Sequence, residues 1–139
     1  MNLVFVADAS VAVSWVIPSQ ASSATDGLLD QVMAGSGIAV PSIWPFEVAN
    51  SLVVLLRRKK ILREDYLAAR ALFSGLRASI DDEGAHFTAE RIADLALDHG
   101  LSVYYAAYLE LAIRKRLALA SRDADLNRAA THCGVRLLL

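Results

Sequence analysis

Short apolar runs alternate with longer amphipathic segments along the chain. The run LVFVA at 3–7 is continuously apolar and rich in β-branched residues. This pattern is typical of a strand that is buried on both faces, as in a parallel sheet with helices above and below. By the same pattern we predict strands at 3–7, 38–41, 77–80, 117–121 and 135–139.

The segments between these runs carry apolar residues at helical spacing. We predict helices at about 11–16, 22–34, 43–59, 63–76, 88–99, 102–116 and 123–131. Thr88 and Ser102 are predicted N-caps, and Gly100 is predicted to end the fifth helix in a left-handed conformation. The acidic stretch 81–84 (DDEG) is predicted to be a solvated turn. Since strands and helices alternate throughout, the sequence predicts an α/β fold with a central parallel sheet.

Composition limits the class of protein. With 139 residues, of which 55% are hydrophobic, the chain is long enough for one domain (1–139) with a substantial core. Fifteen acidic and fourteen basic residues give a net charge of −1, so a nucleic-acid surface must be a local patch. The single cysteine, Cys133, excludes an intrachain disulfide and suits a reducing compartment. No apolar run approaches the ~18 residues of a membrane helix, so we expect a soluble cytoplasmic protein without membrane contact.

Three carboxylates fall where ligands bind in open parallel sheets, just beyond the carboxyl ends of the strands. Asp8 follows the first strand, Asp123 follows the strand at 117–121, and Glu47 lies early in the helix after the second strand. Each has an ordinary alternative role, because an aspartate can cap a helix and a glutamate suits the positive end of the helix dipole. Their recurrence at one sheet edge favours a site for hydrated Mg²⁺ or Mn²⁺, which would offset the cost of burying carboxylates together.

At this point the chain resembles the PIN-domain family, and in particular the VapC-type toxins of type II toxin–antitoxin systems. The matching pieces run in the order of the family and cover essentially the whole chain. They are DAS (8–10), PFEVANSL (45–52), DHGLSVYYAAYLELA (98–112), LALASRDADL (117–126) and GVRLL (134–138).

The resemblance implies a three-layer α/β/α sandwich with a mainly parallel sheet. It implies an endoribonuclease that depends on Mg²⁺ or Mn²⁺ and cleaves structured cellular RNA (tRNA or rRNA) to stop translation. It also implies a homodimer and a VapB-like antitoxin that lays its C-terminal segment across the active site. The acidic residues of the family, which are catalytic and bind the metal, correspond to Asp8, Glu47 and Asp123.

One position departs from the family pattern. A further family acid belongs in the motif Y-D-A-A-Y-L, and here its position holds Tyr105. A phenol with a pKa near ~10 is neutral at physiological pH, so the site loses one negative charge and is expected to bind metal more weakly. Three explanations stay open: a natural variant with altered metal use, a deliberately inactivated toxin, or a harmless change because three acids suffice. An inactive PIN domain that binds RNA or an antitoxin is therefore an alternative function.

Four polar residues are candidates for supporting this site. Ser10 and Ser121 either orient the aspartates beside them or are ordinary cap and turn hydroxyls. Asn50 shares a helix face with Glu47 and is either a hydrogen-bond donor to the site or a neutral amide at the edge of the core. Asp125 is close enough in sequence to reach a metal through water.

Two basic runs, 57–60 (RRKK) and 114–116 (RKR), close predicted helices. Each is either a solvated helix end that offsets the dipole or a patch that follows RNA phosphates. The helices at 43–58 and 63–76 carry more apolar surface than one small sheet covers, which favours a homodimer or an antitoxin groove. A phosphotransfer domain with Asp8 as the acceptor is a further alternative, although the chain lacks the paired acids and the late lysine of such domains.

Overall fold

The computed structural model describes residues 2–139 and has a four-stranded, all-parallel sheet at its centre. The strands are β1 (Leu3–Ala7), β2 (Gly37–Val40), β3 (Ala78–Ile80) and β4 (Ala118–Ala120), in the order β3-β2-β1-β4. In register, Phe5 lies opposite Ile38 on one side and Ala118 on the other. The predicted parallel sheet is therefore confirmed, with the apolar run 3–7 as one of its two inner strands.

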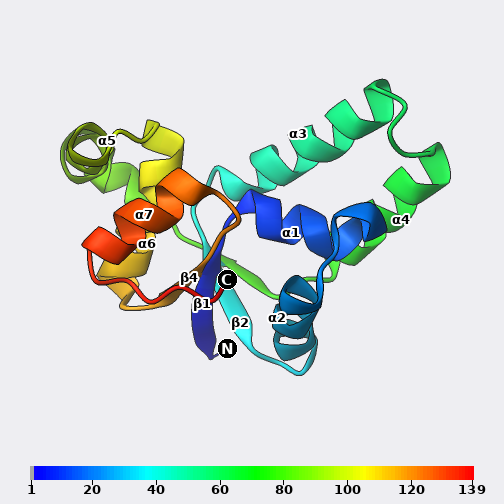
Figure 1. Cartoon of the computed structure of the whole chain (residues 1–139), viewed down its shortest axis with the longest axis horizontal. Helices are drawn as coiled ribbons and strands as arrows, with labels where there is room; N and C mark the ends of the chain where they lie inside the picture. The colour runs from blue at the N-terminus through cyan, green and yellow to red at the C-terminus, as the bar shows by residue number, and fades with distance from the viewer. Residues whose placement is uncertain (1) are drawn as a thin grey trace.

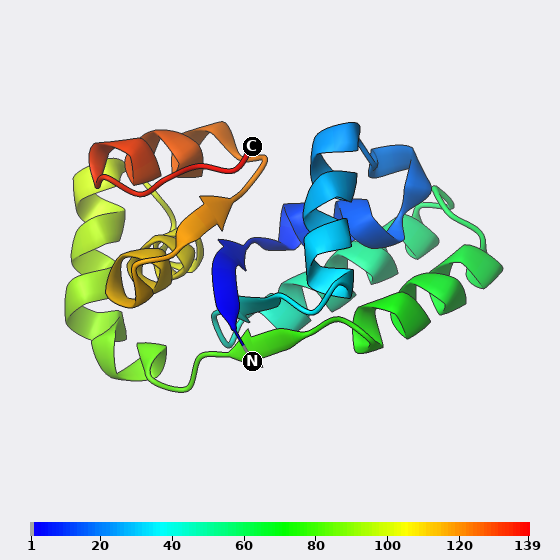
Figure 2. The ribbon, with the colours of Figure 1, turned by 90° about the horizontal axis from the view of Figure 1, so that it is seen from below.

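Helices cover both faces of this sheet. In Figures 1 and 2, α5, α6 and α7 gather on one side of the strands and α1 to α4 on the other. This arrangement confirms the predicted three-layer α/β/α sandwich. The α-helices are α1 (Ala9–Val16), α2 (Ser23–Met33), α3 (Trp44–Arg57), α4 (Arg63–Ser74), α5 (Ala93–His99), α6 (Val103–Lys115) and α7 (Ala124–His132).

The inner strands form the centre of the core. Phe5, Val6, Ile38 and Val40 have no solvent exposure, as expected for strands that carry helices on both faces. None of the helices within residues 2–139 combines the length and the apolar character that a membrane span requires.

Two of the three predicted helix ends are confirmed. The Ser102 hydroxyl accepts a hydrogen bond from the backbone N–H of Tyr105 (3.1 Å) and so caps α6. Gly100 ends α5 with a φ of 65°, in the left-handed region that glycine enters at little cost.

The predicted helix 88–99 is wrong in its first half. The chain makes a 3-10 turn (Gly84–Phe87), then a π-helical turn (Thr88–Ile92), and only then α5. The Thr88 hydroxyl donates to the Gly84 carbonyl (3.3 Å), so it does not cap a helix. Because the 3-10 turn begins at Gly84, Thr88 lies within a helical segment and not at its N-terminus.

The predicted last strand at 135–139 is reduced to one isolated bridge, between Leu119 and Leu137. The Leu119 N–H donates to the Arg136 carbonyl (2.8 Å) and the Leu138 N–H to the Leu119 carbonyl (3.0 Å). Because β4 has only three residues, it offers too short an edge for a longer ladder.

The acidic stretch 81–84 is not a simple solvated turn. Arg114 donates from Nη2 to Asp81 (2.6 Å) and from Nε to Glu110 (2.6 Å), and Glu110 is 1% exposed. These ion pairs hold the segment 81–84, which follows β3, against α6. Arg114 is therefore neutralised by these two acids, which removes the first charge of the run 114–116 from any RNA surface.

Candidate active site

Asp8, Glu47 and Asp123 lie at the carboxyl edge of the sheet. Asp8 directly follows β1, and its N–H donates to the Ala120 carbonyl at the end of β4 (3.1 Å). Asp8 and Glu47 line one hollow of about 260 Å³, and the charge of Asp123 is close enough to raise the pKa of Asp8. The structure thus brings together three acids that are far apart in the sequence.

Asp8 is a buried carboxylate with three hydrogen-bond donors. It is 2% exposed, and it accepts bonds from Ser10 Oγ (2.6 Å), Ser121 Oγ (2.5 Å) and the Val11 N–H (3.1 Å). Burial raises its pKa, the two hydroxyls lower it, and the charge of Asp123 raises it again. Both serines therefore act on Asp8, and the Val11 bond shows that Asp8 caps α1 as well.

Glu47 is held by Tyr108, which is not among the predicted site residues. The buried Tyr108 donates its hydroxyl to Glu47 Oε1 at 2.6 Å. Burial raises the pKa of Glu47, the Tyr108 bond lowers it, and the charge of Asp8 raises it. The sequence contains one sign that Tyr108 belongs to the site: it lies three residues after Tyr105, so the two side chains lie on the same face of the helix.

We predict that Tyr108→Phe raises the pKa of Glu47 further. The variant removes a donor that stabilises the ionised carboxylate and leaves burial in place. NMR titration of the glutamate side-chain carboxyl should show the shift, with Tyr104→Phe as the matched control because Tyr104 is 63% exposed and lines a different hollow. An unchanged Glu47 titration in Tyr108→Phe would contradict this account of the bond.

Tyr105 stands in the hollow with Asp8 and Glu47 and is 36% exposed. Burial raises the pKa of its phenol, and the nearby charges, with Asp123 first among them, raise it further. The phenol is therefore neutral, as expected from the sequence, and its ring forms part of the wall of the site.

The remaining candidates have different outcomes. Asn50 lines the hollow. Asp123 caps α7 through the Leu126 N–H (2.8 Å), so its structural role coexists with its place at the site. Asp125 instead pairs with Arg128 at 2.7 Å on the surface, so the expectation that it serves the site is not supported.

The acid site fits a hydrated divalent cation. Across residues 2–139, no side-chain nitrogen of a Lys or Arg lies within 4.0 Å of a carboxylate oxygen of Asp8, Glu47 or Asp123, so these carboxylates lack a cationic partner. In the same span, the acids that bring one carboxylate oxygen each to within 4.8 Å of one another are 81–83, two of which, Asp81 and Glu83, already pair with Arg114. The three site acids do not meet this distance criterion, so an ion bound there would have to keep several waters, as Mg²⁺ does.

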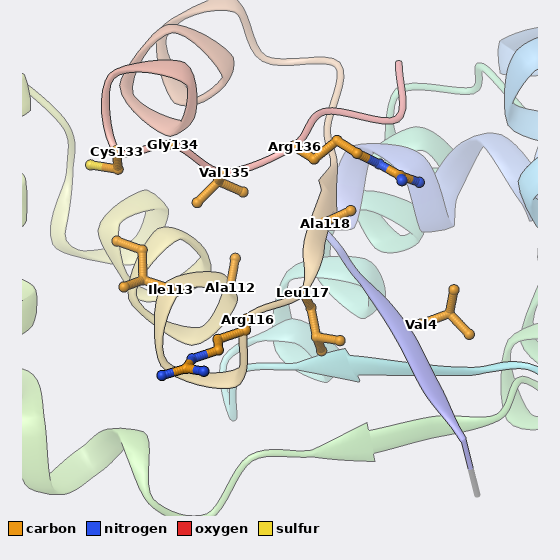
Figure 3. A pocket seen from close by; sticks show the side chains of 10 residues that line it. All are labelled: Val4, Ala112, Ile113, Arg116, Leu117, Ala118, Cys133, Gly134, Val135 and Arg136. Atoms are coloured by element: carbon orange, nitrogen blue, oxygen red, sulfur yellow. The ribbon is translucent and has the colours of Figure 1, made fainter.

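A larger hollow of about 560 Å³ lies beside the C-terminal segment, near the amino ends of β1 and β4. Figure 3 shows that Arg116 and Arg136 extend in opposite directions there. Among the described residues no carboxylate lines it, in contrast to the smaller hollow at the opposite edge of the sheet, which Asp8 and Glu47 line.

Comparison with known proteins agrees with this fold. Among solved structures, the fold is similar to that of PAE2754 from Pyrobaculum aerophilum, with a TM-score of 0.69, 18% identity, and 99% and 92% of the two chains covered. The fold is also similar to that of FitAcB from Neisseria gonorrhoeae, with a TM-score of 0.60 and 24% identity; the match covers 99% of this chain and 96% of the other. A third similar structure is VapBC2 from Rickettsia felis, bound to a DNA fragment from their promoter. The TM-score is 0.60, the identity is 15%, and the match covers 96% of each chain.

At these identities the likeness to solved structures concerns the fold. A comparison with curated proteins gave no match. The sequence matches the PIN domain family over residues 5–131, which is most of the chain. The protein therefore belongs to the PIN domain family.

Proposed function

We propose that the chain is a VapC-type toxin, an endoribonuclease that uses Mg²⁺ or Mn²⁺ to cleave tRNA or rRNA. The observation that carries this proposal is the group of three carboxylates at the carboxyl edge of the sheet, without a cationic partner in residues 2–139. Membership of the PIN domain family supports a nuclease.

Each acid has a role that follows from its surroundings. Asp8 is kept in one orientation by Ser10 and Ser121, so it would hold the metal directly together with Asp123. Glu47, fixed by Tyr108, would act through a metal-bound water or as a further ligand. When bound, the metal would lower the pKa of its water and polarise the phosphoryl oxygen of the RNA.

The partner proposals have separate support. VapBC2 and FitAcB, which have the same fold, support a VapB-like antitoxin as the inhibitor of this chain. Exposed leucines on and beside α4 (Leu62, Leu67 and Leu72) support an apolar interface in a homodimer.

The purified chain is expected to cleave tRNA or rRNA in Mg²⁺ or Mn²⁺ and to lose this activity in EDTA. Asp125→Asn is the matched acid control and should cleave like the wild type, because Asp125 is 65% exposed and paired with Arg128. Gel analysis of defined RNAs checks both statements. Cleavage that persists unchanged in EDTA would contradict metal dependence.

A non-catalytic PIN domain is the second candidate, and Tyr105 is the observation that favours it. The phenol lines the hollow in place of a charged ligand, so the site has one negative charge fewer. Retained RNA or antitoxin binding without cleavage in Mn²⁺ would identify this case. A phosphotransfer role for Asp8 has no comparable support, since the run 8–10 (Asp-Ala-Ser) offers no second acid and no lysine follows Lys115.

A further inference from the structure

Arg122 is fixed next to the acid site by its own backbone. Its N–H donates to Ser10 Oγ (3.3 Å), and the same hydroxyl donates to Asp8 Oδ1 (2.6 Å). Arg122 also lies between Ser121 and Asp123 in the sequence, two residues that belong to the site. The main chain of Arg122 is therefore positioned by the hydrogen bonds that orient Asp8.

The guanidinium of Arg122 is also held in place, but without an acid. Nη1 donates to the backbone carbonyl of Gln20 (2.8 Å), in the 3-10 turn at the far end of α1. In the described chain, 2–139, no carboxylate lies within 4.0 Å of this side chain. Arginine has five N–H donors in a planar fork, so several remain available to an anion.

A groove leads from the acid site past Gln20. A hollow of about 310 Å³ is lined by residues of α1 and α3, and by Gln20 itself. It shares Ser10 and Ser51 with the hollow that Asp8 and Glu47 line, so the two hollows adjoin. Figure 1 shows that α1 and α3 both extend away from the sheet. The two helices contact each other, and residues of both line the hollow.

The far end of the groove is basic. Beyond Val54 and Leu55, which line the hollow, α3 ends in the exposed run 57–60 (RRKK). Arg58 lies eleven residues after Glu47, which is about 16 Å along a helix. In the described part of the chain, none of these four cations is in an ion pair. The groove therefore leads from the acids past Gln20, whose carbonyl holds the guanidinium of Arg122, toward a run of cations that form no ion pair within residues 2–139.

We propose that the groove between α1 and α3 seats the RNA strand on one side of the cleaved phosphate, and that Arg122 binds a backbone phosphate of that strand. This inference rests on the proposed function, and it specifies where the RNA strand lies relative to the acid site. A polyanion fits this distribution, because its scissile phosphate would lie at the metal site while its neighbours meet cations. Arg122 is a substrate-binding residue in this account.

The test is the salt dependence of RNA binding. Fluorescence anisotropy with a labelled single-stranded RNA, in EDTA to prevent cleavage, gives log K against log salt for each variant. Arg122→Gln and Arg58→Gln should each make the slope shallower by about 0.7, which is the value for one phosphate contact to a single strand. At about 0.1 M salt this corresponds to about fivefold weaker binding. Arg128→Gln is the matched control, since Arg128 is exposed but paired with Asp125.

Three results would overturn or separate the claims. If the wild type cleaves RNA but Arg122→Gln leaves the slope unchanged, the path is wrong and the proposed function stands. If Arg122→Gln leaves the slope unchanged and instead releases a co-expressed antitoxin, the groove belongs to the antitoxin. If the wild type neither binds nor cleaves RNA, the proposed function itself fails.

Discussion

Asp8→Asn is expected to lower RNA cleavage by at least about 100-fold. Loss of a residue that merely supports a metal ligand typically costs 10–100-fold, and Asp8 is proposed as a ligand itself. The asparagine keeps the size of the side chain and can still bond to Ser10 and Ser121, so the geometry is retained and the charge is lost. Cleavage rates in Mn²⁺ measure the effect, with Asp125→Asn as the control.

The same variant should be more stable than the wild type at about pH 7 when metal is removed. Burial raises the pKa of Asp8 above its ordinary value of 3.8, so the folded state binds the proton more tightly than the unfolded state. The stability contributed by such a group is fully present below 3.8 and is lost as pH rises through the raised pKa. Ionised Asp8 therefore destabilises the metal-free protein near neutrality.

Thermal unfolding in EDTA tests whether Asp8→Asn is more stable than the wild type. The advantage of Asp8→Asn over the wild type should be greatest near neutral pH and should shrink as pH falls through the raised pKa of Asp8. Full cleavage activity in Asp8→Asn, or an advantage that grows on acidification, would contradict the role given to Asp8.

Tyr105→Asp is expected to increase Mn²⁺ affinity about tenfold and to raise RNA cleavage. The phenol is neutral, and the aspartate would add a charge to the hollow that Asp8 and Glu47 line. One added charge at about 6 Å from a divalent ion contributes roughly 1.4 kcal/mol even at the dielectric constant of water, which is tenfold in affinity.

Calorimetric titration with Mn²⁺ and an RNA cleavage assay measure the two effects. Tyr104→Asp adds the same charge one residue away, but its side chain is 63% exposed and lines a different hollow, so it should change neither. Equal affinity and equal activity in Tyr105→Asp and the wild type would show that three acids suffice.

Most of the architecture follows from patterns that are local in the sequence. The apolar run 3–7 predicts a strand buried on both faces, and the rule that ligands bind beyond strand ends places Asp8 and Asp123 at one edge. Gly100 and Ser102 mark helix ends because their conformations and bonds depend on adjacent residues alone.

The missed features depend on contacts between distant residues. Tyr108 and Glu47 are 61 residues apart, and Arg114 and Asp81 are 33 apart, so only the folded chain shows that they meet. The turns before α5 were missed for a related reason. These turns come directly after the segment that the Arg114–Asp81 ion pair holds against α6. The pattern of residues 88–99 contains no sign of that ion pair.

The central claim is that Asp8, Glu47 and Asp123 hold the divalent metal. The most direct measurement is anomalous diffraction from crystals soaked in Mn²⁺. We predict a manganese peak in the hollow at the carboxyl edge of the sheet, adjacent to Asp8, that is absent from Asp8→Asn crystals. No peak there, or a peak only at the acidic stretch 81–83, would contradict the account.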